Sequence, residues 1–233
     1  MMRVAIIEHA SFEGAGAIGA WARERGNDTR TVDALRGDFP TPDQYDLLVV
    51  LGGPMGAGDE ALNPWLAAEK RAIRSAVDSG ALVLGVCLGA QILADVLGAK
   101  VSRNPEPEIG WFPVVLNENG RRSKVFGGLP VSFVAGQWHG DTFGIPGGAI
   151  LTASSDACVN QAFEFDGGRV VGVQFHLEWT ARDVEALVAN CGADLVPATH
   201  VVKVEKFIAG ERVHGPECRR LLYSLLDAMT QFG

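Results

Sequence analysis

Cys87 lies at the centre of the segment GVCLG, residues 85–89, between an apolar run and a stretch with helical periodicity. The thiol therefore stands where a predicted strand turns sharply into a predicted helix. Side chains two positions before and after it would collide in such a turn, and Gly85 and Gly89 remove them. This is the nucleophile-elbow pattern with sulfur in place of oxygen, and it predicts a strained backbone and a reactive sulfur exposed at the carboxyl edge of a sheet.

The helix expected over residues 88–98 would point its amino terminus at Cys87. Its partial positive charge favours a thiolate over a thiol, whose unperturbed pKa is about 8.5. The Leu88 amide, first after the nucleophile, would be free to donate to a developing oxyanion. The alternative is a buried structural cysteine beside a closely packed helix, because free cysteines are among the most buried residues.

A second glycine-rich segment, GGPMG at residues 52–56, follows another predicted strand, as GVCLG does. In a parallel sheet the two segments would lie at the same edge, where ligands bind in open α/β sheets. Because Pro54 has no N–H, the Gly53 amide is the expected second oxyanion donor. An ordinary tight turn would also explain these glycines. A phosphate loop would not, because no Lys-Ser/Thr pair follows them.

His176 is the one histidine at the end of a strong predicted strand with an acid two residues further on, in VQFHLE, residues 173–178. Side chains at i and i+2 of an extended backbone project to the same side. Glu178 could therefore hold the ring nitrogen of His176 that faces away from the sulfur, as a cysteine nucleophile requires of its base. A surface pair at a strand end is the alternative. Along this chain the order is nucleophile, histidine, acid, whereas in α/β-hydrolases the acid precedes the histidine.

Strands and helices alternate along the first hundred residues. The strand-like segments are 3–9, 29–34, 46–53 and 81–86, and the helix-like segments are 17–26, 63–80 and 88–98. Asn63 is the expected cap of the second helix, with Gly80 at its end. Strands that are apolar on both faces, alternating with helices, predict a parallel sheet covered by helices on both sides.

The chain becomes richer in strands after residue 100. Further strands are expected in 111–116, 131–138, 149–154, 160–167 and 169–175, several joined by glycine-containing turns that suggest hairpins. A helix capped by Thr180 is expected over 180–192. The simplest organisation is one domain, 1–233, with a mainly helical C-terminal extension at about 195–233.

Composition narrows the class of protein. The 233 residues are 47% hydrophobic and 21% charged, as in an ordinary globular protein with a sizeable core. The net charge of −8 argues against nucleic acid or an anionic membrane as a partner. No apolar run approaches the ~18 residues of a membrane span or the h-region of a secretory signal. The cysteines are far apart, without a CxxC pair, so neither a zinc site nor a disulfide framework is expected. A cytoplasmic location is expected instead.

Three of these segments, 52–56, 85–91 and 174–178, resemble the signature segments of class I (triad-type) glutamine amidotransferase domains. Two others extend the resemblance, EIGW at 108–111 and WHGDTF at 138–143. The last is similar to the glutaminase part of GMP synthase and of its stand-alone relatives. The resemblance spans about residues 4 to 190, and the combination of all segments in order is specific.

The resemblance implies a flavodoxin-like three-layer α/β/α sandwich with a mainly parallel sheet, and no cofactor. By position it implies a catalytic triad of Cys87, His176 and Glu178, with oxyanion donors at Gly53 and Leu88. It also implies a set of substrate-binding residues, in which the last four hold the α-amino and α-carboxylate groups of glutamine largely through backbone: Gln91, Trp138, His139, Gly140 and Asp141.

Two departures from the family pattern stand out. Leu177 replaces the proline that many members carry between histidine and acid, which should leave this loop less rigid. No segment after residue 195 resembles a synthase domain. The acceptor of ammonia therefore stays open, and a separate synthase subunit is one candidate partner.

Other polar and aromatic residues have simpler interpretations. His139 and Asp141 alone make a poor metal site, because two ligands on one loop lack a third. His9 is expected to make a satisfied local hydrogen bond. The stretch E106-P-E108 is interpreted as a solvated loop. Packing is the expected role of three tryptophans: Trp65, Trp111 and Trp138.

Three functions fit the sequence. The first is hydrolysis of the glutamine side-chain amide through a γ-glutamyl thioester on Cys87. The second keeps this chemistry but takes small γ-glutamyl peptides as substrate. The third is a regulatory or binding subunit with a vestigial pocket.

Overall fold

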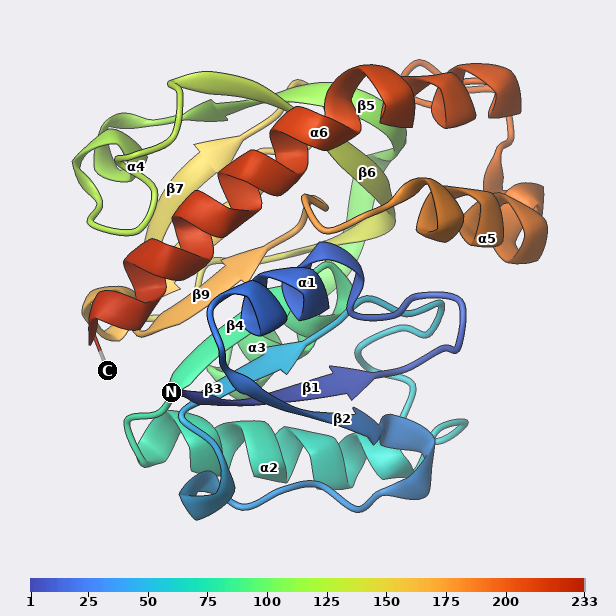
Figure 1. Ribbon diagram of the computed structural model, residues 1–233. Helices are drawn as coiled ribbons and strands as arrows, with labels where there is room; N and C mark the ends of the chain where they lie inside the picture. Colours follow the sequence, from blue (N-terminus) through green and yellow to red (C-terminus); the bar gives the residue numbers. More distant parts are fainter. Residues whose placement is uncertain (233) are drawn as a thin grey trace.

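The computed structural model describes residues 1–232, which contain one nine-stranded sheet in the order β2-β1-β3-β4-β9-β8-β7-β5-β6 (Figure 1). The strands are β1 (Arg3–Glu8), β2 (Asp28–Asp33), β3 (Leu47–Val50), β4 (Leu82–Val86), β5 (Val101–Leu116), β6 (Ser132–Phe143), β7 (Ile150–Ser154), β8 (Ala162–Phe165) and β9 (Val170–Val173). Each segment predicted as a strand contains or overlaps one of them.

The sheet is mixed. Strands β2, β1, β3, β4 and β9 run parallel, whereas β9-β8, β8-β7, β7-β5 and β5-β6 pair antiparallel. The expectation of a mainly parallel sheet is therefore wrong for the second half of the chain. The connections from β7 to β8 and from β8 to β9 are short and force antiparallel pairing there, because a parallel neighbour needs a long crossover connection.

Helices cover both faces of the sheet (Figure 1). They are α1 (Gly16–Glu24), α2 (Trp65–Asp78), α3 (Leu88–Val96), α4 (Glu118–Arg122), α5 (Ala181–Cys191) and α6 (Val204–Met229). Side chains alternate across each strand, so Ile6 and Leu84 pack with α1 and α6, whereas Ile7 and Val83 pack with α2 and α3. Within residues 1–232, no helix combines the length and the apolar character needed to cross a bilayer.

The helix boundaries agree closely with the sequence, with one correction. Pro64, not Asn63, is the residue at the N-cap of α2, and no side chain caps that helix. Gly80 follows the other end with a φ of +77°, as its position predicted. Thr180 precedes α5, where its amide donates to Asp183 Oδ2 over 2.8 Å.

The turn from β4 to α3 leaves no room for side chains at its two glycines. A Cβ on Gly85 would lie 2.6 Å from the Gly89 carbonyl oxygen. A Cβ on Gly89 would lie 2.0 Å from the carbonyl oxygen of Val50, on the neighbouring strand β3. The two glycines thus allow α3 to begin directly against the backbone of the sheet.

Gly89→Ala is expected to lower the free energy of unfolding by roughly 1–3 kcal/mol, because the new methyl group overlaps backbone that cannot move aside cheaply. Gly58→Ala is the matched control, since a Cβ there meets nothing within 4 Å. Urea denaturation monitored by circular dichroism measures both. Equal stability of the two variants would contradict this account of the turn.

Candidate active site

Cys87 occupies the turn between β4 and α3 with φ 52° and ψ −110°, a strained conformation for a residue other than glycine. Its amide donates to the Val173 carbonyl at the end of β9 over 2.8 Å. The expected exposed sulfur is wrong, because the residue is only 7% exposed. The Trp138 carbonyl and the Gln174 amide lie 3.8 Å and 3.5 Å from the sulfur and cover it.

His176 and Glu178 form a buried pair just beyond β9. His176 Nδ1 lies 2.5 Å from Glu178 Oε1, and the two residues are 2% and 4% exposed. The i, i+2 spacing predicted this contact, and its burial excludes an ordinary surface pair. The His176 ring stacks on Trp179 with centroids 4.0 Å apart. Backbone hydrogen bonds with Gly136 hold the segment against β6.

Leu177 strengthens the pair. Its N–H donates to Glu178 Oε2 over 3.0 Å. A proline at this position would have no N–H to donate. The loop expected to be less rigid therefore has a hydrogen bond of its own that orients the carboxylate.

The electrostatics of His176 favour its charged form. Burial lowers the pKa of the imidazole. This effect is outweighed by the charge of Glu178, the interaction with the Cys87 thiol and the hydrogen bond to Glu178, which together raise the pKa to about 10. Cys87 and His176 line one small cavity of about 70 Å³, together with Gly53 and Glu13. Sulfur and imidazolium thus face the same enclosed space.

Gly53 and Leu88 lie where two oxyanion donors are expected. Gly53 follows β3, the neighbour of β4, and lines both the small cavity and a larger one beside Cys87. Leu88 opens α3 and lines the larger cavity. In the described part of the chain, neither amide donates a hydrogen bond. Both are therefore available to an acceptor that enters the site.

The larger cavity is open and measures about 620 Å³. Its lining includes the residues expected to bind substrate: Gln91, Trp138, His139, Gly140 and Asp141. The Gln91 side chain is 4% exposed, and its amide nitrogen donates to the Asp141 carbonyl (3.3 Å) and to Gln174 Oε1 (3.1 Å). Gln91 thus ties α3 to the segment 138–141 that forms one wall.

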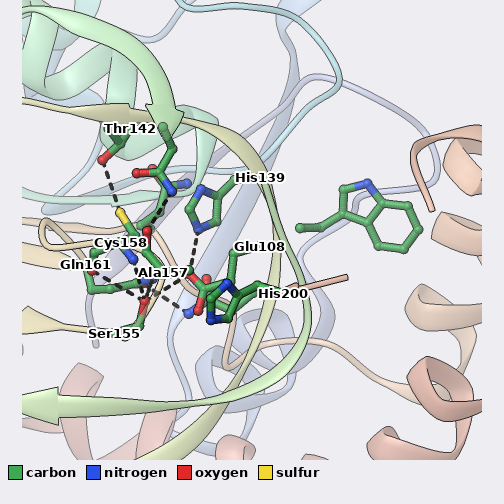
Figure 2. A network of polar contacts seen from close by, with 12 residues as sticks. Glu108, His139, Thr142, Ser155, Ala157, Cys158, Gln161 and His200 are labelled. Atoms are coloured by element: carbon green, nitrogen blue, oxygen red, sulfur yellow. Dashed lines mark hydrogen bonds and ion pairs between the residues drawn. The ribbon is translucent and has the colours of Figure 1, made fainter. Parts of the chain in front are cut away.

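The His139 side chain points into a buried polar network (Figure 2). Its Nδ1 contacts the Asp141 carbonyl at 2.9 Å, and its Nε2 lies 3.2 Å from Glu108 Oε2. The same Glu108 oxygen accepts hydrogen bonds from Ser155 (3.0 Å) and Gln161 (2.8 Å). The interpretation of residues 106–108 as a solvated loop is wrong for Glu108, which is 0% exposed within β5. Donors on β6 and in the connection between β7 and β8 satisfy Oε2, whereas Oε1 has no hydrogen-bond partner in the described residues.

Trp138 both packs and lines the site. Its ring lies 5.0 Å from that of Phe207 on α6, consistent with a packing role. Its Nε1 donates to Asp194 Oδ2 over 3.1 Å, and both residues border the two cavities. Asp194 carried no signal in the sequence, because its partner is 56 residues away.

Glu13 is a second carboxylate that the sequence motifs did not indicate. It lines the small cavity, and its carboxyl group accepts no hydrogen bond within residues 1–232. Burial raises its pKa, with the His176 charge opposing this and the Glu178 charge adding to it. Its place shortly after the carboxyl end of β1 is the signal that could have identified it, because that edge of the sheet collects functional residues.

His9 is fully buried at the end of β1. Its Nδ1 lies 2.9 Å from the Gly52 carbonyl oxygen and its Nε2 lies 2.8 Å from Glu69 Oε1. Its hydrogen bonds are satisfied as expected, but the partners are distant in sequence. Across residues 1–232, no group of three or more His, Cys, Asp or Glu side chains could hold a metal ion.

The fold and the arrangement at this edge of the sheet agree with the comparisons to known proteins. The family model for class-I glutamine amidotransferases matches residues 22–194, and the chain belongs to this family. The glutamine amidotransferase-like protein YfeJ of Salmonella typhimurium is 36% identical, over 98% of each chain. The GMP synthase of Vibrio vulnificus is 33% identical over 58% of this chain, which corresponds to 24% of the synthase.

Solved structures extend these similarities. A glutamine amidotransferase from Thermotoga maritima is 33% identical and covers 97% of each chain with a TM-score of 0.87. One from Methylobacillus flagellatus is 27% identical with a TM-score of 0.91, and the match covers 99% of this chain and 94% of the other. The similarity therefore extends over nearly the whole described chain, including α6.

Replacing Glu178 by Gln is expected to lower the pKa of His176 from about 10 toward its ordinary value of ~6.5, because the neighbouring negative charge is lost. Since the folded-state pKa is raised, the stability from this pair is complete below pH ~6.5 and is lost as the pH rises through about 10.

Titration of the His176 ring by NMR measures this pKa directly. Glu106→Gln, which removes the carboxylate 2.8 Å from His200 Nδ1, is the matched control and leaves His176 unchanged. An unaltered His176 titration in Glu178→Gln would refute the assigned cause.

Proposed function

We propose that this chain hydrolyses the side-chain amide of glutamine through a γ-glutamyl thioester on Cys87 and releases ammonia. The observation that carries the proposal is one cavity lined by a strained cysteine and by the imidazole of a buried His–Glu pair. Membership of the class I family supports the same chemistry.

In the first step Cys87 gives its thiol proton to His176, and the sulfur attacks the amide carbon, forming an S–C bond. The oxygen becomes an oxyanion that accepts hydrogen bonds from the Gly53 and Leu88 amides, each contributing roughly 10²–10³ in rate. The tetrahedral intermediate collapses with cleavage of the C–N bond. His176, charged and oriented by Glu178, gives its proton to the departing nitrogen, which leaves as ammonia.

In the second step water attacks the thioester carbon. His176, now neutral, takes the proton of this water and returns it to the sulfur as the S–C bond breaks, which releases glutamate. The pair of steps follows the acyl-transfer scheme in which one imidazole serves as acid and then as base. Gln91 and the segment 138–141 are proposed to hold the amino-acid end of the substrate in the larger cavity.

The leaving nitrogen must point toward His176, and so toward the small cavity. A volume of about 70 Å³ accommodates ammonia or water more readily than an amino acid. Glu13 is proposed to accept a hydrogen bond from the departing ammonia there. This closed side favours glutamine over γ-glutamyl peptides, whose leaving group is an amino acid or peptide.

The chain is proposed to form one domain, 1–233, with a mainly helical C-terminal extension at about 195–233, of which Gly233 lies outside the described residues. The relatives include a GMP synthase of Thermoplasma volcanium whose name describes it as one subunit of that enzyme. A separate synthase subunit that accepts the ammonia is proposed on that basis.

Cys87→Ala is expected to abolish ammonia release, with a loss of at least about 10³-fold in kcat, because no other group can form the thioester. Cys158→Ala is the matched control, since Cys158 is also a buried thiol but does not line either cavity. A coupled assay for glutamate and ammonia measures both variants, with circular dichroism to verify the fold. Full activity of Cys87→Ala would disprove the mechanism, and an inactive wild-type protein would favour a binding or regulatory role.

Glutamine is expected to have a kcat/KM at least about tenfold above that of γ-glutamyl dipeptides, because the small cavity accommodates ammonia more readily than their leaving group. Competition assays with mass spectrometry of the trapped acyl-Cys87 adduct compare the two substrates directly. Faster acylation by the dipeptides would reverse the assignment and identify a γ-glutamyl peptide hydrolase.

A further inference from the structure

The Gly52–Gly53 peptide carries one of the proposed oxyanion donors, and its own residues do not fix its orientation. Glycine populates both signs of φ at little steric cost, so a peptide flanked by two glycines can rotate through half a turn. Its carbonyl and N–H belong to one planar trans unit and point in opposite directions. Rotation would therefore replace the Gly53 N–H by the Gly52 carbonyl oxygen, which repels an oxyanion. The Leu88 amide differs, because α3 holds it.

His9 contacts this peptide from behind. Its Nδ1 lies 2.9 Å from the Gly52 carbonyl oxygen, and since that oxygen can only accept, Nδ1 carries the proton. Gly53 packs directly against the same residue, because a Cβ on Gly53 would lie 2.8 Å from the His9 Cβ. One side chain thus fixes the carbonyl end of the peptide and adjoins its amide end.

Glu69 holds His9 in turn. The carboxylate lies 2.8 Å from His9 Nε2, and both side chains are 0% exposed. Glu69 shares the buried face of α2 with Leu66 and Ile73, so a carboxylate here is exceptional. Burial lowers the pKa of His9, but the hydrogen bond and charge of Glu69 outweigh it and raise the pKa.

The position of this pair is more informative than its contribution to stability. A buried ion pair is seldom more stabilising than apolar residues of similar volume. The second oxygen of Glu69 has no hydrogen-bond partner in the described residues, which adds to the cost of burial. The presence of this costly pair, whose Nδ1 contacts the Gly52 carbonyl, is explained if the orientation of the Gly52–Gly53 peptide matters for function.

We propose that His9, held by Glu69, is a positioning residue that fixes the Gly52 carbonyl and thereby keeps the Gly53 N–H directed at the acyl oxygen of the substrate. This inference rests on the proposed function, since it assigns a cause to the geometry of one oxyanion donor. His9 acts through the backbone and does not touch the substrate.

Two double variants test the proposal. His9→Phe with Glu69→Leu replaces the pair by apolar side chains, which should preserve the fold but remove the donor. His9→Asn with Glu69→Leu differs only in its first residue, and the Asn amide nitrogen lies close to the former place of Nδ1. The Phe variant is expected to lose roughly 10²–10³ in kcat with little change in KM, and the Asn variant to recover at least about tenfold of that loss.

Two reagents separate positioning from a general structural effect. Glutamate γ-semialdehyde adds the Cys87 sulfur at its aldehyde carbon, and the oxygen of the resulting hemithioacetal occupies the oxyanion position. Its affinity should fall in the Phe variant about as much as kcat does. Iodoacetamide is attacked at carbon with loss of iodide and forms no oxyanion, so it should alkylate Cys87 at the wild-type rate in both variants.

His200→Phe removes another histidine that is paired with a carboxylate, and it is expected to change kcat by no more than about twofold. Wild-type rates in the Phe variant, or equal losses in the Phe and Asn variants, would overturn the positioning role. Slower alkylation in step with the loss of kcat would overturn it too, as a general distortion. A wild-type protein that neither hydrolyses glutamine nor binds the aldehyde would instead disprove the proposed function itself.

Discussion

The parallel pairing of β4 with β9 decides where the proposed reactive groups meet. The two strands end in register at Val86 and Val173, and the Cys87 amide extends the ladder by one more hydrogen bond to β9. The backbone therefore leaves both strands at the same edge of the sheet, after β4 into α3 and after β9 toward His176. A slip of one residue would turn every side chain of either strand to the opposite face. Backbone pairing thus brings the segments that carry Cys87 and His176 to the same place, and side-chain contacts with Glu178 and Trp179 orient the imidazole.

Buried histidine–carboxylate pairs recur around this edge. Each pair joins a histidine to a glutamate, and in each the ring or the carboxylate also contacts backbone near the site: His9–Glu69 at Gly52, His139–Glu108 at Asp141 and His176–Glu178 at Leu177. Burying such pairs is costly, since desolvation offsets most of the Coulomb attraction. Two of them contact backbone just beyond strand ends, at Gly52 and Leu177, whereas His139–Glu108 joins paired residues of β5 and β6 next to an irregularity in their register. The edge that binds ligands in an α/β sheet is in this way held by side chains.

The sequence predicted the local features well and the long-range ones poorly. The strained turn at Cys87 and the contact between His176 and Glu178 follow from spacing within a few residues, and both are present. The expectation of a mainly parallel sheet was wrong for the second half of the chain, because strand direction depends on pairing between segments far apart. Glu69 stood at a helical spacing from Leu66 and Ile73 that marks a buried face, yet nothing in α2 indicates that its partner lies at the end of β1.

Glu108 shows why buried polar residues are hard to recognise. A Glu-Pro-Glu stretch is polar by composition, and solvent is its commonest surrounding. The cost of its burial is reduced because donors on β6 and in the connection between β7 and β8 converge on one carboxylate oxygen. These elements meet through antiparallel strand pairings that local periodicity does not encode. The donors are ordinary histidine, serine and glutamine side chains. Only the fold brings them together at the Glu108 carboxylate.

The end of the chain is part of the same core as the site. Phe207 on α6 lies 5.0 Å from Trp138 and 5.7 Å from Trp179, and Trp179 stacks on the His176 ring at 4.0 Å. One aromatic cluster thus connects the final helix both to the wall of the larger cavity and to the imidazole. Rings packed at these distances resist displacement, because interiors are as dense as organic crystals. We therefore infer that α6 limits how far the imidazole and the cavity wall can move, although its own sequence contains none of the segments that define the family.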